Sequence, residues 1–206
     1  MEVMSNVINS YWGVELKTHL VNQGSETLAI VLPGIGYTLD RVTLEYISEL
    51  SLKLGYDLIK VEYGFQIARK TFDVAKEFDI VAKETLEQIN SILNSKYKNI
   101  VIIGKSIGTC VQDVLNENIK GYNITNVYIS PIDKTVNMGI KENSLVITGS
   151  ADPLLKEENI SKINRINGVK LIKFEGANHA LNIEKHPIDS LKIQIDIIKA
   201  VEDYLK

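Results

Sequence analysis

Short runs of apolar residues, separated by longer stretches with helical periodicity, are the feature that most constrains how this chain folds. Leu28 to Leu32 contains only apolar residues, and so do Ile100 to Ile103 and Leu145 to Ile147. Strands that are apolar on both faces fit the interior of a parallel sheet that helices cover on each side. Weaker runs of the same kind lie at residues 57–63, 126–130 and 169–174.

The segments between these runs predict helices. Within residues 74–93, apolar side chains recur at steps of three and four, which places them on one face of a helix. Residues 39–54 show the same spacing, and so do residues 187–205, which begin with a proline suited to a first helical turn. Residues 14–20 instead alternate between apolar and polar side chains, which predicts a half-exposed edge strand. Together these elements predict an α/β fold with a mostly parallel central sheet and helices on both faces.

Composition narrows the class of protein. Neither an internal repeat nor a linker rich in proline, glycine or serine interrupts the 206 residues, so we expect a single domain over residues 1–206. The 23 basic and 26 acidic side chains give a net charge of −3, which argues against a general nucleic-acid-binding protein. Cys110 is the only cysteine, which excludes an intramolecular disulfide and a zinc site built from several cysteines.

We expect neither a signal peptide nor a membrane span. The first basic residue is Lys17, so the N-terminus lacks the positive region of a signal peptide. No uncharged stretch approaches about 20 apolar residues, the length needed to cross a bilayer. These features favour a cytoplasmic protein without a membrane partner. The chain also lacks complete nucleotide-binding motifs. Asn99 stands where a P-loop has its first glycine, and Leu39 stands where a dinucleotide-binding loop has its third glycine. We expect no cofactor or metal.

The most informative loop is the pentapeptide at residues 104–108, Gly-Lys-Ser-Ile-Gly. It follows the predicted strand at 100–103 and precedes a predicted helix that carries Cys110. A G-x-S-x-G sequence between a strand and a helix is typical of a nucleophile elbow, in which a sharp, strained turn lifts the serine hydroxyl clear of the sheet. Ser106 is therefore the candidate nucleophile. The alternative is a glycine-rich turn whose serine only caps the helix.

A serine nucleophile needs a general base, and the chain offers three histidines. His19 lies on the polar side of the predicted edge strand, where solvation is its simplest role. His186 precedes Pro187 and is placed to cap the last helix. His179 lies just past the last predicted strand, downstream of the elbow, and we expect it to be the base.

The acid that orients the histidine should lie between the serine and the histidine in the chain, because the partners of a serine in a G-x-S-x-G elbow follow it in the order acid, then histidine. Asp152 follows the predicted strand at 145–149 and is the favoured candidate. Its alternative role is helix capping, since an aspartate followed by proline also suits the start of a helix. Asp133, after the preceding predicted strand, is the rival acid.

Acyl transfer also needs donors for the oxyanion that forms on the substrate. The backbone N–H of Ile107, directly after the nucleophile, is one candidate, and the loop after the first central strand should supply the other. Gly34 and Gly36 let that loop approach a bound carbonyl closely, and Ile35 N–H is our choice. Four side chains near these loops are candidates for a substrate pocket: Tyr37, Tyr63, Phe65 and Lys105.

In these four loops, from Pro33-Gly34 through the elbow and Asp152 to His179, the chain resembles the α/β-hydrolase superfamily. The resemblance spans roughly residue 12 to the C-terminus. It implies Ser106 as nucleophile, His179 as general base and then acid, and Asp152 as the residue that fixes the imidazole tautomer.

Two departures from that family narrow the expected activity. Many lipases and esterases carry His-Gly in the oxyanion loop, where this chain has Pro33-Gly34. Many members also insert a lid, for which the segment at 132–143 is too short. The sequence thus resembles a small, lidless serine hydrolase acting on a small-molecule ester or thioester, similar to carboxylic ester hydrolases. The alternatives are a non-catalytic module that binds a ligand or protein, and an acyltransferase or peptidase that uses the same residues.

Overall fold

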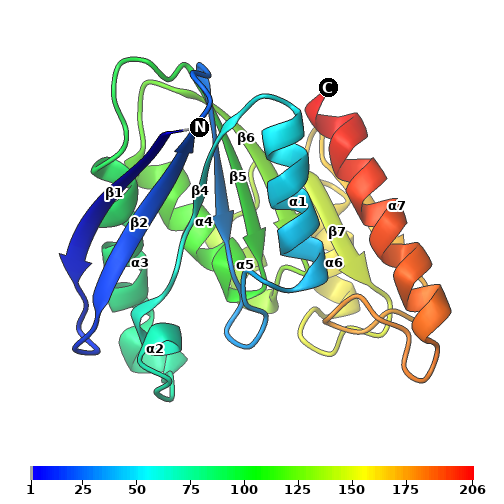
Figure 1. Cartoon of the computed structure of the whole chain (residues 1–206). Helices are drawn as coiled ribbons and strands as arrows, with labels where there is room; N and C mark the ends of the chain where they lie inside the picture. Colours follow the sequence, from blue (N-terminus) through cyan, green and yellow to red (C-terminus); the bar gives the residue numbers. More distant parts are fainter. Residues whose placement is uncertain (1) are drawn as a thin grey trace.

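The structure is a computed structural model that describes residues 2–206, with side chains from residue 6 onward. Its centre is an eight-stranded sheet in the order β1-β2-β4-β3-β5-β6-β7-β8 (Figure 1). The strands are β1 (Glu2–Asn9), β2 (Glu15–Asn22), β3 (Thr27–Leu32), β4 (Asp57–Lys60), β5 (Asn99–Lys105), β6 (Asn123–Ile129), β7 (Leu145–Gly149) and β8 (Lys170–Phe174). Strands β3 to β8 are parallel, and β1 and β2 pair antiparallel at one side.

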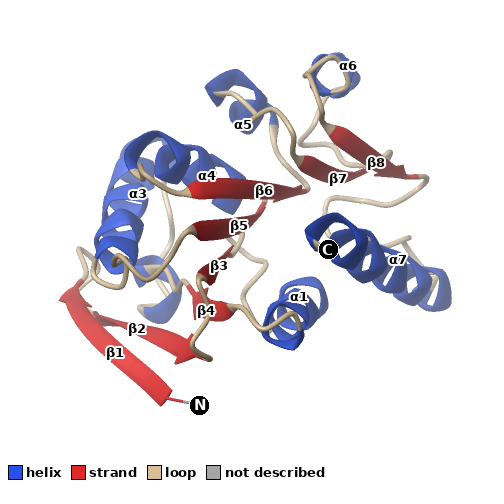
Figure 2. Ribbon diagram, turned by 90° about the horizontal axis from the view of Figure 1, so that it is seen from above, coloured by secondary structure: helices blue, strands red, loops and turns tan. Residues whose placement is uncertain are grey.

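Helices cover both faces of this sheet (Figure 2). They are α1 (Val42–Lys53), α2 (Gly64–Ile67), α3 (Val74–Asn90), α4 (Ile107–Asn118), α5 (Asp133–Met138), α6 (Glu157–Ile163) and α7 (Pro187–Leu205). α1 and α7 pack on one face, while α3 and α4 pack on the other. α6 packs on strands β6 and β7 on the same side as α4. The mostly parallel α/β fold expected from the sequence is therefore confirmed.

The two-sided burial of β3 and β5 explains their uninterrupted apolar runs. Leu28 and Ile30 of β3 point toward α3 and α4, and the intervening Ala29 and Val31 point toward α1 and α7. These four side chains have no exposed surface. Since successive residues of a strand face opposite sides, only a continuous apolar run satisfies both layers.

The N-terminal edge differs from the sequence-based expectation. The segment at 14–20 was expected to form an edge strand, but β2 lies between β1 and β4, and the strand at Glu2–Asn9 was not anticipated. In β2, Leu16 and Thr18 are buried while Lys17 and His19 are exposed. This alternation arises because one face of β2 is open to solvent, and it carries no information about which strand lies beside it.

The parallel arrangement collects the loops of interest at one end of the molecule. Because the strands run in the same direction, the segments after β3, β5, β7 and β8 all emerge at the carboxyl edge of the sheet. Between β6 and β7 the only helix is the six-residue α5, so the described chain has no lid there, as expected. Among the described residues, no helix has the length and apolar character required to cross a membrane.

The contact between α4 and the end of β3 gives a first prediction. A methyl group on Gly108 would stand 2.6 Å from the carbonyl oxygen of Pro33 and 2.7 Å from that of Leu32. Gly108→Ala should therefore lower the free energy of unfolding by about 1–3 kcal/mol, the usual cost of overpacking. Urea unfolding followed by circular dichroism measures it. Gly36→Ala is the matched control, since a methyl group there meets nothing within 4 Å. Equal stability of the two variants would contradict the close packing.

Candidate active site

Ser106 lies in a strained turn between β5 and α4. Its backbone has φ 56° and ψ −120°, a conformation that non-glycine residues rarely adopt. Two backbone hydrogen bonds hold it: Ser106 N–H donates to the Ile129 carbonyl at 3.0 Å, and Thr109 N–H donates to the Ser106 carbonyl at 2.9 Å. The turn therefore holds the hydroxyl-bearing residue in one defined position.

The two glycines of the pentapeptide serve this turn through the space they leave. Neither has a positive φ, so the conformational strain falls on Ser106 itself. A methyl group on Gly104 would meet Gln112 Oε1 at 2.5 Å and the Gly108 carbonyl oxygen at 2.8 Å. Gly108 in turn lies against the end of β3. Both positions require glycine because backbone and side-chain atoms pack directly onto them.

Three predicted side chains from separate loops lie in hydrogen-bond contact. His179, after β8, has its Nε2 2.8 Å from Ser106 Oγ and its Nδ1 2.8 Å from Asp152 Oδ2. The side chain of Asp152 is 1% exposed and that of His179 is 24% exposed. Because an ionised carboxylate only accepts, Nδ1 carries the proton and Nε2 is left to accept from the serine hydroxyl. An imidazole oriented in this way can remove the proton of an attacking hydroxyl.

Asp133 lies elsewhere. Its Oδ1 accepts from the backbone N–H of Lys156 at 3.0 Å and from the side-chain amide of Asn159 at 2.6 Å. It therefore connects the start of α5 to the start of α6. Asp152 does not cap a helix, since α6 begins at Glu157 and Asp152 Oδ1 instead accepts from Leu154 N–H at 2.9 Å. The structure brings Asp152, not Asp133, to His179.

The loop after β3 lies directly against the elbow. A methyl group on Gly34 would stand 3.2 Å from the Cβ of Ser106. Within the loop, Gly34 N–H donates to the Tyr37 carbonyl at 2.9 Å, which bends the chain around Ile35. Ile107 is the first residue of α4, where backbone N–H groups have no partner within the helix. The structure thus sets the two segments that carry the predicted donors, Ile35 and Ile107, beside Ser106.

Gln66 of α2 fixes this loop, and the sequence analysis did not find it. Its side-chain amide donates to the Gly34 carbonyl at 2.8 Å and to the Ile35 carbonyl at 3.1 Å. Holding both carbonyls sets the orientation of the peptide groups around Ile35. No motif includes this glutamine, because α2 is a four-residue helix that reaches the loop only through the tertiary fold.

A cavity of about 500 Å³ opens beside Ser106 and His179. Its lining is mostly apolar: Ile35 and Leu154, 43% and 48% exposed, form part of it together with Tyr37. The predicted pocket position of Tyr37 is therefore consistent with the structure. The remaining lining residues are Gly36, Pro153, Asn178 and Ala180.

The other three predicted pocket residues do not line this cavity, which corrects the sequence-based expectation. Tyr63 is buried among core side chains, and its ring stacks on Phe65. Phe65 also stacks on Phe72, so its aromatic character serves the packing beneath the loop. Lys105 has no exposed surface and cannot meet a substrate in the cavity. Sequence position at a strand end does not distinguish inward-facing from outward-facing side chains.

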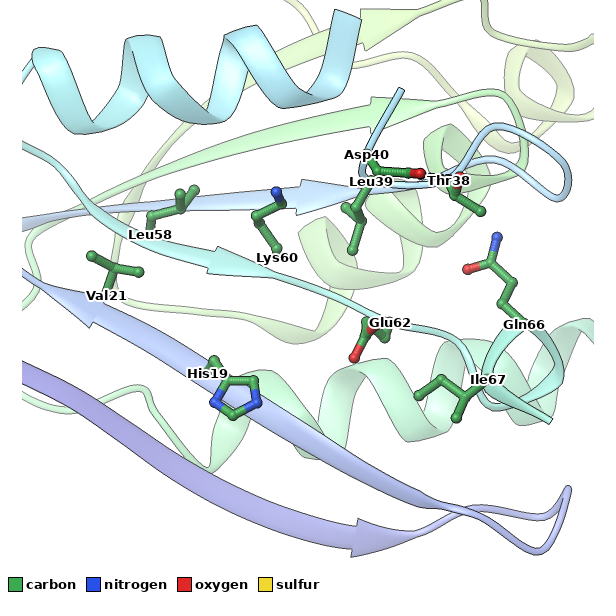
Figure 3. A pocket seen from close by; sticks show the side chains of 10 residues that line it. All are labelled: His19, Val21, Thr38, Leu39, Asp40, Leu58, Lys60, Glu62, Gln66 and Ile67. Atoms are coloured by element: carbon green, nitrogen blue, oxygen red, sulfur yellow. Dashed lines mark hydrogen bonds between the residues drawn. The ribbon is translucent and has the colours of Figure 1, made fainter. Parts of the chain in front are cut away.

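A second hollow of about 480 Å³ lies between β2, β4 and the end of the loop after β3 (Figure 3). His19 of β2 and Lys60 of β4 line it, together with Thr38, Asp40 and Glu62. Neither Ser106, Asp152 nor His179 contributes to it. Gln66, which donates to the Gly34 carbonyl, also lines this hollow. Ser106 and His179 instead line the cavity of about 500 Å³ described above.

Lys105, which precedes Ser106 in the chain, is buried and contacts the loops of His179 and Tyr37. Its Nζ donates to the backbone carbonyl of His179 at 2.7 Å and lies 4.9 Å from the centre of the Tyr37 ring. Burial lowers the pKa of Lys105 to about 7, and the negative charge of Asp152 opposes part of that shift. The residue was proposed as a substrate contact, and the structure instead gives it internal partners.

Comparisons with known proteins find similarity to solved structures. No protein-family model matches the sequence, and no curated protein matches it significantly. Among solved structures, an esterase from Pyrococcus furiosus is 20% identical with a TM-score of 0.69, over 99% of this chain and 92% of that one. An α/β serine hydrolase without a lid from Xanthomonas campestris is 13% identical with a TM-score of 0.71, over 100% and 94%. At such identities the likeness concerns the fold.

The buried lysine predicts how stability depends on pH. The unfolded chain keeps Lys105 protonated up to its ordinary pKa of 10.5, whereas the folded chain releases the proton near pH 7. Between these values the unfolded state binds more protons, so this residue makes the free energy of unfolding rise with pH. Below pH 7 the full cost of the buried charge is present, and Lys105→Met should be more stable than wild type there.

Urea unfolding across this pH range measures the difference between wild type and Lys105→Met. We expect the advantage of the methionine variant to shrink steadily as pH rises from 7 to 10.5. Exposed Lys83 supplies the control: Lys83→Met should follow wild type at every pH. A difference between wild type and Lys105→Met that stays constant with pH would contradict the buried charge.

Proposed function

We propose that this chain, which has the α/β-hydrolase fold without a lid, is a serine hydrolase that cleaves a small-molecule ester or thioester through an acyl-enzyme on Ser106. The single observation that carries the proposal is the contact of one imidazole with two partners. His179 lies 2.8 Å from the Ser106 hydroxyl on one side and 2.8 Å from the Asp152 carboxylate on the other. This geometry matches the roles of nucleophile, base and orienting acid.

In the proposed reaction, Ser106 Oγ attacks the substrate carbonyl while its proton passes to His179 Nε2. The tetrahedral intermediate collapses, and His179 returns the proton to the departing alcohol or thiol, which leaves Ser106 acylated. Water then attacks the acyl carbon with His179 again as base, and the acid is released. Asp152 keeps the imidazole in the required tautomer and stabilises its protonated form.

The backbone N–H groups of Ile35 and Ile107 are the proposed oxyanion donors. Support comes from the close approach of Gly34 to Ser106 and from the position of Ile107 at the start of α4. Donors that are fixed before the reaction stabilise the developing charge without reorganisation. The two hydrogen bonds from Gln66 to the Ile35 loop supply that rigidity.

The cavity beside Ser106 supports a small, largely apolar acyl group. Ile35, Tyr37 and Leu154 provide apolar contacts within about 500 Å³, the size of a small-ligand site. Lys105 does not face this cavity, and no lysine or arginine among the described residues lines it. We therefore propose a short-chain uncharged ester or thioester as the substrate class.

Two other functions fit the same fold. A hydrolase-like module that binds without turnover would not need the strained conformation of Ser106, whose cost is about 1–3 kcal/mol. Acyl transfer or peptide hydrolysis would use the same acyl-enzyme and differ in the acceptor or in the bond broken. Activity with esters, thioesters and amides separates these reactions.

Labelling with a fluorophosphonate probe tests the nucleophile. The probe phosphonylates an activated serine, and mass spectrometry of the digested protein should place the adduct on Ser106. Because His179 accepts the serine proton, His179→Ala should abolish the labelling within the assay time, and His19→Ala should label like wild type. No adduct on Ser106, or undiminished labelling of His179→Ala, would overturn the assignment.

Paired carboxylate substitutions test the acid. Asp152→Asn should lower kcat for a short-chain ester by about 10⁴-fold, because the amide favours the wrong imidazole tautomer. Asp133→Asn is the matched control, since Asp133 contacts only the region between α5 and α6. Steady-state kinetics at one pH compares them. A large loss in Asp133→Asn with Asp152→Asn unaffected would assign the acid to Asp133.

Gln66 tests the proposed oxyanion loop. Gln66→Met preserves the side-chain size but removes both hydrogen bonds to the loop, so we expect kcat to fall about 10- to 100-fold with little change in KM. Gln23 offers a matched control, because its side-chain amide also donates to two carbonyls, Leu52 and Tyr56, at 3.0 and 2.8 Å. Gln23→Met should keep the wild-type kcat. Equal kcat values for the two variants would contradict the proposal that Gln66 holds the oxyanion loop in place.

A further inference from the structure

Lys105 connects three of the four loops that carry the proposed chemistry. It precedes Ser106 in the elbow, its Nζ donates to the His179 carbonyl at 2.7 Å, and it lies over the Tyr37 ring of the oxyanion loop. Its side chain has no exposed surface. Burying an ammonium is costly, so such a residue is expected only where the charge has defined partners.

Lys105 contacts the backbone carbonyl of His179, not its imidazole ring. That carbonyl belongs to the residue whose imidazole must stay aligned with Ser106 Oγ and with Asp152 Oδ2. The loop after β8 has its own hydrogen bonds through Asn178, whose side chain accepts from the N–H groups of Ala180 and Asn182. Lys105 directly precedes Ser106, so its hydrogen bond to the His179 carbonyl joins this loop to the elbow.

We propose that Lys105 is a positioning residue for the hydrolase reaction: its protonated side chain holds the backbone of His179 and thereby keeps the imidazole in register with Ser106. The inference rests on the proposed function of Ser106 and His179. Charge matters because a hydrogen bond from an ammonium is about twice as strong as one from a neutral amine.

The groups that face Lys105 set the expected pH dependence. Asp152, after β7, is the charged group that acts on it and favours its protonated form. Tyr37, after β3, presents the face of its ring, and His179, after β8, presents its carbonyl. Burial opposes the charge and outweighs Asp152, so the pKa of Lys105 lies near 7. The charge-assisted hydrogen bond is therefore present below pH 7 and is replaced by a weaker neutral one above it.

The test compares kcat of wild type with Lys105→Met and Lys105→Gln across pH. Methionine removes the donor, and glutamine keeps an uncharged N–H donor. We expect Lys105→Met to lower kcat about 10- to 100-fold below pH 7 with little change in KM, because a displaced base costs turnover more than binding. The ratio of wild-type to variant kcat should fall as pH rises past 7, since the wild type then loses its charge.

In the ratio of wild-type to variant kcat, any pH dependence that wild type and variants share cancels. Lys105→Gln should fall between the other two below pH 7 and approach the wild-type kcat above it. Lys83→Met, at an exposed position, should match wild type throughout. Unchanged kcat in Lys105→Met, or a ratio that is flat with pH, overturns the proposal.

A second readout separates this inference from the proposed function. The NMR signal of the His179 Nδ1 proton, which is hydrogen-bonded to Asp152, reports the register of the imidazole without turnover. It should shift in Lys105→Met and remain in place in Lys83→Met. If no ester is cleaved and Ser106 is not labelled, while this signal still shifts, the hydrolase proposal fails and the positioning role stands. An unshifted signal in Lys105→Met overturns the positioning role.

Discussion

The close contact between the first turn of α4 and the end of β3 is the constraint on which the rest of the site depends. Gly108 packs directly against the carbonyl groups of Leu32 and Pro33, with no space for a side chain between them. This contact sets the elbow and the following loop side by side, which puts Gly34 against the Cβ of Ser106. The strain at Ser106 persists because packing on both sides leaves the turn no alternative. One backbone contact therefore positions both the hydroxyl and the donors proposed to act with it.

Beneath this surface lie two buried charges of opposite sign. Asp152 and Lys105 are both almost wholly enclosed, and neither is paired directly with the other by a hydrogen bond. Each instead binds a different part of His179: Asp152 contacts the ring and Lys105 contacts the backbone carbonyl. These two polar contacts, one to the ring and one to the backbone, restrict the orientation of the ring and the position of its loop. Burying Asp152 and Lys105 costs free energy, and what the fold gains in return is a precisely positioned His179.

The sequence predicted the parts of the fold whose signal is local, and it missed those that depend on distant partners. β3 and β5 were found because burial on both faces demands continuous apolar residues. The contact among Ser106, Asp152 and His179 was anticipated because all three follow strand ends. β1 was missed, and β2 was mistaken for an edge, because alternation reports the burial of faces and not the neighbouring strand. Gln66 and the inward orientation of Lys105 were missed for a related reason. Their partners, Gly34 and His179, are brought to them only by the tertiary fold.

The absence of a lid among the described residues also bears on the fate of the proposed acyl-enzyme. Enzymes that transfer an acyl group to an acceptor other than water must keep water away from the intermediate, commonly by closing a loop or domain over it. Here His179 is 24% exposed, and the cavity beside Ser106 is lined by the partly exposed Ile35 and Leu154. Because only the short α5 lies between β6 and β7, the described chain leaves this cavity open, and water would reach the acyl carbon of the proposed intermediate. For the proposed reaction, an open site of this kind favours hydrolysis over transfer as the second step.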